Sequence, residues 1–555
     1  MTVFFVRMQR YKHAPCSRLL YFCGMTTIYG KTPNSLLLFA HAILSGLLLN
    51  LSWAPHPYTA LVFVALVPML FVAKGFRQQP GLVFLALFTG FFVFHAGAAW
   101  WMYSSTFVGS LLAHLLNAFL PSAALVLWAV IPPKVIKPIG RGLLLVSIWL
   151  SMEWLNAVWP FAWPWFQLGH VFGAQPKWVQ WYSLTSSVGG SAWVIMVNYL
   201  FFKSLSTLPK LQSGHLMVAI VTATAPILFS YLMPKVDQTT DSKTIAVVQP
   251  NIHPQREKFG GMDAGAQLDK AISLLSSAGH GTVNYVVFPE TMIVEPIEES
   301  LMHESKPVRL LKAVVAEKKL DGIFTGAFTM RTKGADGHEE EKGKEVLYNS
   351  MLFISADSIQ VYHKEKLVPL VEKQPLLWLF KPFRQFLESN GAYFGSYGTD
   401  NIKRYFRLDN RMAAIPLICF ESAFACHPDQ VPIHAFAVLV TNDGWWSSPG
   451  GYTQHLNLAR IRAIERRIWV VRSANTGVSC LIDPQGEVTG AIGYGSEGLM
   501  AYEVFAASPV LLSCRSMHFM RWSALVLLLV ALVMSAVDKI RTEKRVNGQK
   551  TSNNG

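Results

Sequence analysis

The stretch FMRWSALVLLLVALVMSAV, residues 519–537, contains a single charged residue, Arg521. A helix needs about 20 mostly apolar residues to cross a bilayer, so this stretch predicts a transmembrane span. Seven further candidate spans precede residue 235, at 35–53, 58–73, 81–102, 108–131, 142–159, 184–202 and 215–233. Residues 235–518 contain no comparable stretch. The sequence therefore predicts a helical membrane domain over 35–234, a globular block over 235–518 and a last span, about eight spans in all.

The composition agrees with a membrane protein, because 52% of the 555 residues are hydrophobic and only 15% are charged. The net charge is +14, but the basic residues lie between apolar segments and form no stripe, so nucleic acid is not a predicted partner. The six cysteines show neither a C-x-x-C pair nor a zinc-ligand spacing. We therefore expect no metal site, no cofactor and no cystine framework.

Basic residues orient the spans. Most of those between the spans fall in alternate loops: Lys74, Arg77, Lys134, Lys137, Arg141, Lys203 and Lys210. These loops are predicted to lie on the same side of the membrane as the N-terminal segment and as Lys539 and Arg541, which follow the last span. The positive-inside rule then places both termini in the cytoplasm and residues 235–518 outside it. Residues 1–34 have no cleavage-like small-residue site and are interpreted as a cytoplasmic leader, with Met1 or Met25 as the start. Residues 538–555 form a basic cytoplasmic tail.

The globular block alternates short β-rich runs with helical patterns. Predicted strands lie at 243–252, 283–290, 321–328, 349–355, 412–421 and 436–444, and predicted helices at 264–278, 307–320 and 453–467. This alternation is typical of a layered α/β domain. Catalytic side chains gather at strand ends in such domains.

Three polar residues lie where apolar runs end: Glu290 after YVVFP, Lys364 after IQVYH and Cys419 after IPLI. A thiol is an effective nucleophile only as a thiolate, so it requires a neighbouring base or positive charge. Glu290 and Lys364 together supply both. Taken alone, a glutamate at such a position is more often a helix cap or part of a salt bridge, a lysine is more often a solvated charge, and a cysteine is more often a buried core residue.

The sequence motifs around these three residues are more specific than the residues themselves. The stretches FPET (288–291), KEKLVPLVE (364–372), CFESAF (419–424), TNDGWW (441–446), QHLNLARIRAIE (454–465) and VVRSANTG (470–477) resemble the nitrilase, or carbon-nitrogen hydrolase, superfamily. Together with the spans they resemble its apolipoprotein N-acyltransferase branch, over residues 35–537. The resemblance implies an extracytoplasmic αββα sandwich joined to the multispan membrane domain, in the bacterial inner membrane with the sandwich in the periplasm.

The resemblance also implies roles for particular residues. Glu290 would be the general base, Lys364 the cation that stabilises the oxyanion, and Cys419 the acyl-carrying nucleophile. Glu372 and Glu421 match acidic positions that support the site. Two positions depart from the family's text: Val371 stands where glycine is common, and Phe420, beside the nucleophile, where tyrosine is common.

The activity implied is the last step of lipoprotein maturation. An acyl chain would pass from a phospholipid, phosphatidylethanolamine, through a Cys419 thioester to the N-terminal cysteine of a diacylglyceryl apolipoprotein, by ping-pong kinetics and on a monomeric enzyme. Two rivals stay open: a membrane-tethered amidase that releases acid to water, and a non-catalytic membrane scaffold with a degenerate nitrilase-like module.

The stretch QPLLWLFKPFRQFLESN, 374–390, combines Trp378, Phe380 and Phe383 with basic residues, a composition typical of a lipid interface. In the resembled family the equivalent segment is a mobile lid that contacts lipid. A helix packing its apolar face on the domain core is the alternative.

Within the predicted span 142–159, Glu153 and Asn156 lie one turn apart, either as a functional pair or as a polar contact between helices. Cys426 is interpreted as structural, with oxidation possible outside the cytoplasm. Four charged residues of the second half are expected to form structural salt bridges: Arg460, Arg462, Glu465 and Arg472.

Overall fold

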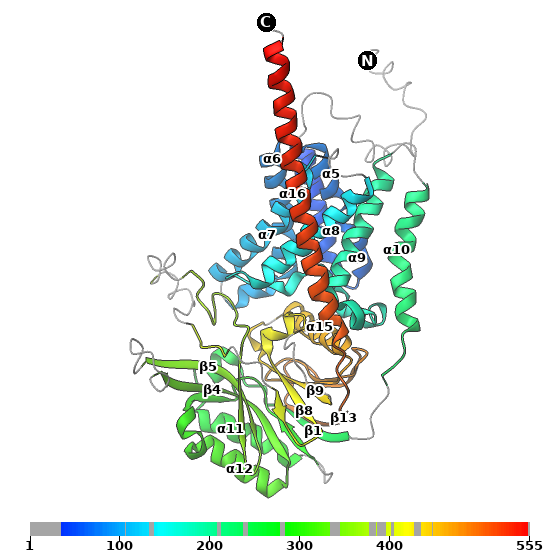
Figure 1. The fold of residues 1–555 in the computed structure, drawn as a ribbon. Coiled ribbons are helices and arrows are strands. Elements are labelled where there is room, and N and C mark those ends of the chain that lie inside the picture. Colours follow the sequence, from blue (N-terminus) through cyan, green and yellow to red (C-terminus); the bar gives the residue numbers. More distant parts are fainter. Residues whose placement is uncertain are drawn as a thin grey trace, which may run out of the picture.

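The computed structural model describes residues 35–105, 107–132, 138–207, 213–236, 242–277, 283–333, 344–376, 385, 396–400, 405–426, 434–446 and 448–552. A helical domain and a two-sheet domain lie end to end, and the helix α16 runs along the former (Figure 1). The leader predicted at 1–34 and the three lipid-contact residues Trp378, Phe380 and Phe383 lie outside the described residues.

Every predicted span corresponds to helix. The helical domain contains α3 (Ser35–Ser52), α4 (Val62–Ala65), α5 (Val67–Gly75), α6 (Pro80–Ala98), α7 (Phe107–Val130), α8 (Pro138–Val158), α9 (Tyr182–Leu205) and α10 (Ser213–Leu232), and α16 (Leu512–Ser552) follows the sheets. Six of the described helices, α3, α6, α7, α9, α10 and α16, are long and apolar enough to cross a membrane. The stretch Thr59–Gly75 is shorter, and α8 carries Arg141 and Glu153.

Two helices differ from the predicted spans. The span predicted at 58–73 is divided at Leu66, and Pro68 lies in the first turn of α5. Proline lacks the amide hydrogen that a helix interior uses, so it favours a new helix start there. The last helix extends beyond 519–537 at both ends. Large apolar side chains on α10 and α16 are widely exposed, including Leu228 (65%), Phe519 (73%) and Val533 (63%), as expected for surfaces that face lipid.

The second domain contains two sheets. The first has the order β13 (Gly498–Phe505), β1 (Ser242–Gln249), β2 (Tyr285–Val287), β4 (Gly322–Lys333), β5 (Lys344–Ile354) and β6 (Ile359–His363), with β3 (Ile293–Glu298) also paired to β4. The second has the order β12 (Val488–Ile492), β11 (Ser479–Ile482), β10 (Val470–Ala474), β9 (Ala435–Thr441), β8 (Ala413–Ile418) and β7 (Phe406–Arg407). The central pairs β1–β2, β2–β4, β8–β9 and β9–β10 are parallel.

The cores show how the layers stack. Apolar side chains of both sheets, among them Val247, Phe324 and Val438, form one buried cluster between them. The outer face of the first sheet packs with α11 (Ala264–Ser273) and α12 (Lys306–Lys318), and that of the second with α15 (Pro449–Arg466). This confirms the predicted helical membrane domain and αββα sandwich. The six predicted strands and three predicted helices of the block are all present.

Candidate active site

Cys419 lies directly after β8, at the start of a 3₁₀ helix, Cys419–Ala423. Its φ is +50°, a left-handed conformation that is uncommon for residues other than glycine. Ser422 Oγ donates a hydrogen bond to the main-chain oxygen of Cys419 (2.9 Å), and Ile418 N donates to Glu421 Oε2 (2.8 Å). The turn therefore presents a half-buried thiol at the end of a buried strand.

Glu290 and Lys364 follow β2 and β6 of the other sheet. Both side chains are buried, and Lys364 Nζ lies 3.3 Å from Glu290 Oε1 and 2.8 Å from Glu372 Oε1. Asn349, on β5, donates from Nδ2 to both carboxylates, at 2.9 Å to Glu290 and 3.0 Å to Glu372. One ammonium and one amide thus hold two carboxylates in place.

Electrostatic interactions join Cys419 to this cluster. Burial and the Glu290 carboxylate raise the pKa of the Cys419 thiol, while Lys364 and a hydrogen bond with Thr441 partly oppose them. Burial acts against the charge of Lys364, but Glu372 and Glu290 outweigh it and raise the pKa of that ammonium. The site therefore places a protonated thiol near a fixed cation, and such a thiol requires a base to become a nucleophile.

The supporting acids act on two loops. Glu372 Oε2 accepts a hydrogen bond from Val368 N (2.8 Å) within the loop that carries Lys364. Glu421 is fully buried, and its Oε1 accepts from Tyr362 OH (2.8 Å) and from Glu365 N (2.7 Å). Glu421 therefore links the turn at Cys419–Ala423 to the loop that follows Lys364.

The two departures from the family's text have structural correlates. In the 367–372 loop the left-handed residue is Leu370 (φ +67°), and Val371 does not have a positive φ. The loop therefore closes without glycine at 371. Phe420 stacks on Trp163, with ring centroids 5.1 Å apart, so an aromatic ring without a hydroxyl fills its position.

A buried network lies behind Cys419, and the sequence predicted only that its Arg472 would form a salt bridge. His455 Nδ1 lies 2.8 Å from Asp443 Oδ1, its Nε2 lies 3.0 Å from the Cys419 main-chain oxygen, and Arg472 lies 2.6 Å from Asp443 Oδ2. Burial opposes the charge of Asp443, but Arg472 and His455 outweigh it and lower the pKa of the carboxyl. The network supports the strained turn from behind.

Lys258 was also missed. Its side chain is buried, and Nζ donates to the Glu290 main-chain oxygen (2.8 Å), which also accepts from Thr291 Oγ1. Burial lowers the pKa of Lys258 to about 7, although Glu290 opposes the shift. In the sequence Lys258 is one more lysine after β1, and in the structure it ends a short π helix, Pro254–Lys258.

The expected salt bridges are confirmed: Arg460 pairs with Glu487, Arg462 with Glu465, and Arg472 with Asp443. Cys426 forms a disulfide with Cys514, at the start of α16. Glu153 Oε1 accepts hydrogen bonds from Trp149 Nε1 (3.0 Å) and Leu168 N (2.9 Å), a polar contact inside the helical domain.

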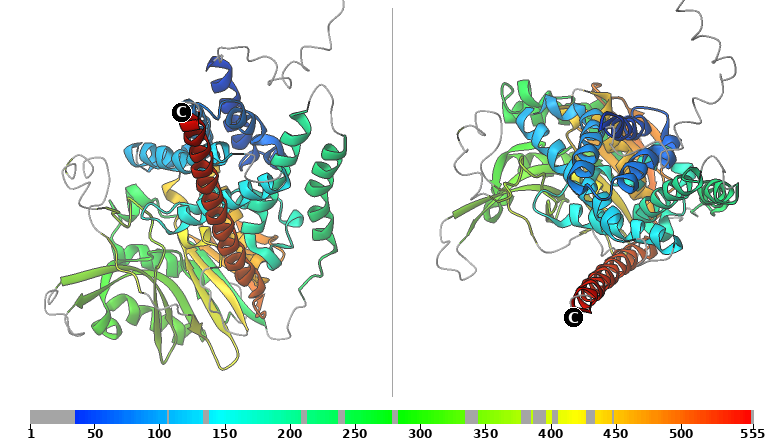
Figure 2. Two further views of the ribbon diagram at one scale, coloured as in Figure 1. Left: turned by 45° about the horizontal axis from the view of Figure 1, so that its top comes forward. Right: turned by 90° about the horizontal axis from the view of Figure 1, so that it is seen from above.

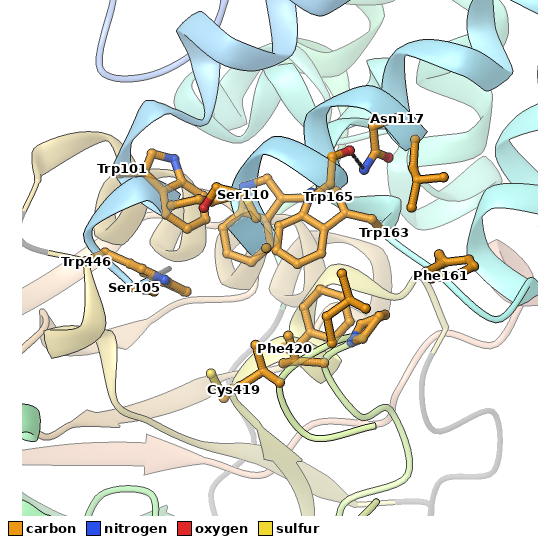
Figure 3. A pocket seen from close by; sticks show the side chains of 18 residues that line it. Trp101, Ser105, Ser110, Asn117, Phe161, Trp163, Trp165, Cys419, Phe420 and Trp446 are labelled. Atoms are coloured by element: carbon orange, nitrogen blue, oxygen red, sulfur yellow. Dashed lines mark hydrogen bonds between the residues drawn. The ribbon is translucent and has the colours of Figure 1, made fainter. Parts of the chain in front are cut away.

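A mostly apolar cavity opens beside Cys419 (Figure 3). Cys419, Phe420, Trp163 and Trp165 all line it, and in this view the first two lie below the two tryptophans. The helical domain supplies a further wall from α7: Gly109, Ser110, Ala113, Leu116 and Asn117. The cavity thus connects the thiol with a membrane helix.

Comparison with known proteins agrees with both domains. Residues 45–200 match the family described as "Apolipoprotein N-acyltransferase N-terminal domain", and residues 244–508 match "Carbon-nitrogen hydrolase". The chain belongs to the N-acyltransferases of the nitrilase superfamily. An apolipoprotein N-acyltransferase of Chlorobaculum tepidum is 29% identical over 480 residues, 80% of this chain and 86% of the relative. Those of Rhodopseudomonas palustris and Pseudomonas paraeruginosa are each 26% identical, over 83% of this chain and 88% and 89% of their own lengths.

This membership makes the chain an acyltransferase of the membrane. It also accounts for the order of the parts, since the matched regions correspond to the helices α3–α9 and to the sandwich.

Proposed function

We propose that this N-acyltransferase moves an acyl chain from a membrane phospholipid to the α-amino group of the N-terminal S-diacylglyceryl cysteine of apolipoproteins, through a thioester on Cys419. The observation that carries the proposal is the setting of Cys419. Its thiol interacts electrostatically with Glu290 and Lys364. Cys419 also lines an apolar cavity, one wall of which is formed by α7. A small polar amide has no use for such a cavity, whereas a fatty chain fits its chemistry.

In the first half-reaction the Cys419 sulfur attacks the ester carbonyl carbon of the phospholipid, and Glu290 takes the thiol proton. Lys364 stabilises the oxyanion that forms, and a donor of this kind contributes roughly 3–4 kcal/mol in a pocket with little water. The carbon–oxygen bond then breaks, and the departing lysophospholipid alkoxide takes the proton from Glu290. The product is an acyl thioester on Cys419.

In the second half-reaction the acceptor's neutral amine attacks the thioester carbonyl carbon. Glu290 takes a proton from the nitrogen, the carbon–sulfur bond breaks, and the proton returns to the Cys419 sulfur. The products are the amide and the free thiol. Water in the cavity would hydrolyse the thioester instead, and the aromatic lining disfavours water there.

The donor is proposed to be phosphatidylethanolamine and the enzyme to act as a monomer. Both substrates are amphiphiles that enter from the bilayer. The segment 374–390, with Trp378, Phe380 and Phe383, is proposed as the lid that contacts them.

The sandwich is proposed to lie in the periplasm, with both termini in the cytoplasm. Two observations support this orientation. The C-terminal part of α16 extends away from the sandwich (Figures 1 and 2), and the sequence of this part of the helix includes Lys539 and Arg541. The disulfide Cys426–Cys514 lies on the sandwich side, and disulfides persist mainly in oxidising compartments.

The test is intact-protein mass spectrometry of purified protein after incubation with phosphatidylethanolamine. Wild type and Cys480→Ser, which alters a buried free cysteine of β11, should gain a fatty-acyl mass that hydroxylamine removes. Cys419→Ser should gain no such hydroxylamine-sensitive mass. Absence of any adduct on reconstituted wild type would refute the acyl-enzyme.

A further inference from the structure

One glutamine joins the two domains at the cavity. Gln454 lies in α15 and is 3% exposed. Its Oε1 accepts hydrogen bonds from the indole nitrogens of Trp101 (3.2 Å) and Trp165 (3.0 Å). Its Nε2 donates to the main-chain oxygens of Ala54 (2.7 Å) and Ala98 (2.8 Å). A side-chain amide has two donors and two acceptor positions, so all four are used.

The partners fix the orientation of the amide. An indole N–H can only donate and a carbonyl can only accept, so exchanging the oxygen and nitrogen of Gln454 would break all four bonds. Ala98 is the last residue of α6, where main-chain carbonyls lack partners within the helix. Gln454 therefore caps α6 while it holds the two tryptophans.

Those tryptophans form part of the cavity wall. Trp101 and Trp165 both line the cavity beside Cys419 (Figure 3), and their rings lie 5.4 Å apart. The first turn of α15 also accommodates Trp101. A Cβ on Gly450 would lie 3.0 Å from the Trp101 ring, and one on Gly451 would lie 2.8 Å from Trp446 and 3.1 Å from the Trp101 ring, so the two glycines leave room for the indole of Trp101. Two independent features of α15 thus hold the same ring.

We propose that Gln454 is a positioning residue that sets acyl-chain specificity: it fixes Trp101 and Trp165 in the wall of the cavity that receives the chain. This inference rests on the proposed thioester at Cys419. Without the amide, two indole N–H groups lose their shared acceptor, and the rings shift to find other partners. The depth of the cavity then changes, while Cys419, Glu290 and Lys364 stay in place.

The experiment offers purified full-length enzyme, in nanodiscs, an equimolar mixture of lauroyl, palmitoyl and stearoyl phosphatidylethanolamines. Mass spectrometry then measures the chain-length distribution of the Cys419 adduct. Gln454→Met should still form adduct, with the lauroyl-to-palmitoyl ratio changed by roughly tenfold, the scale on which an apolar pocket distinguishes one methylene.

The matched control is Gln180→Met. Gln180 is also buried, and its Nε2 donates across the domains to Gln485 O (2.8 Å), but it does not line the cavity. Gln180→Met should keep the wild-type distribution. The same shift in both variants, or no shift in Gln454→Met, would overturn the inference.

A second variant tests the inference in case Gln454→Met does not fold. Trp101→Phe keeps an aromatic ring and the bonds of Gln454 to the main chain but removes one indole donor, and it should also shift the distribution. An unchanged distribution in Trp101→Phe would overturn the inference. Failure of the proposed function itself would look different, because wild type would then carry no adduct.

Discussion

Lys364 Nζ lies closer to Glu372 than to Glu290, at 2.8 Å against 3.3 Å. A buried ammonium that is paired mainly with one carboxylate leaves the other freer to accept a proton. This asymmetry supports the proposed division of roles, with Glu372 as the partner of the cation and Glu290 as the base.

Glutamine substitutions separate these roles. Glu290→Gln removes the base and should slow formation of the Cys419 adduct by about 10²–10⁴-fold, the usual contribution of general base catalysis. Glu372→Gln should slow it less, because the base remains while Lys364 pairs more tightly with Glu290. Single-turnover mass spectrometry measures both rates. Equal losses in the two variants would contradict the division of roles.

Lys258 should make stability depend on pH. The pKa of its ammonium is lowered by burial to about 7 in the fold, whereas an unfolded chain has about 10.4. Between these values the unfolded chain binds more protons, so stability should rise as pH increases from about 7 toward 10. Lys258→Met should lack this rise and should unfold at a higher temperature than wild type near about pH 6, because no buried charge remains.

The measurement is the apparent unfolding temperature in detergent across pH. Lys270→Met is the control, since Lys270 is partly exposed and pairs with Glu497 on the surface. Lys258→Met should also slow adduct formation, because the Glu290 main-chain oxygen loses one of its two hydrogen-bond donors. Parallel pH curves for wild type and Lys258→Met would refute the assignment.

The disulfide should stabilise the nucleophile region. Cys426 and Cys514 are 88 residues apart, and their bond joins the segment after the nucleophile turn to α16. Removing a native disulfide typically costs about 2–5 kcal/mol. The double variant Cys426→Ser/Cys514→Ser should therefore unfold at a lower temperature, and a reductant should lower the unfolding temperature of wild type but not of the double variant. Cys480→Ser, in a buried site without a disulfide, should remain sensitive to the reductant.

Much of the candidate site could be predicted because its polar side chains lie directly after predicted strands. Glu290, Lys364 and Cys419 each follow an apolar run, and the fold brings the ends of β2, β6 and β8 together. The text around them identified the superfamily. Local patterning was therefore sufficient to predict a layered α/β domain and to select these three residues, whereas the sandwich and the proposed roles came from the resemblance to the superfamily.

The supporting contacts could not be predicted, because they join distant segments. The amide of Asn349 reaches Glu290 across 59 positions of sequence, and that of Gln454 reaches Ala54 across 400. Gln454 opens one of the stretches that resemble the superfamily, but the local pattern around either side chain does not give its partners. Hydropathy predicts the length of a membrane span but not whether its helix is interrupted. The division of the helix at Leu66, between α4 and α5, was therefore seen only in the structure.

The α7 wall gives the most direct test of the cavity as an acyl-chain site. Ala113 lines the cavity with a small side chain. Ala113→Phe should fill part of the space, so long chains should fit less well while the reactive groups are untouched. The ratio of lauroyl to palmitoyl adduct on Cys419 should rise by roughly tenfold or more, since apolar pockets distinguish single methylenes on that scale.

Leu115→Phe is the matched control for this prediction. Leu115 lies on the same helix, is 38% exposed and does not line the cavity, so a ring there should leave the ratio at its wild-type value. A similar rise in both variants would indicate a general disturbance of α7. An unchanged ratio in Ala113→Phe would mean that the acyl chain of the thioester lies elsewhere, and the cavity would then lose its proposed role.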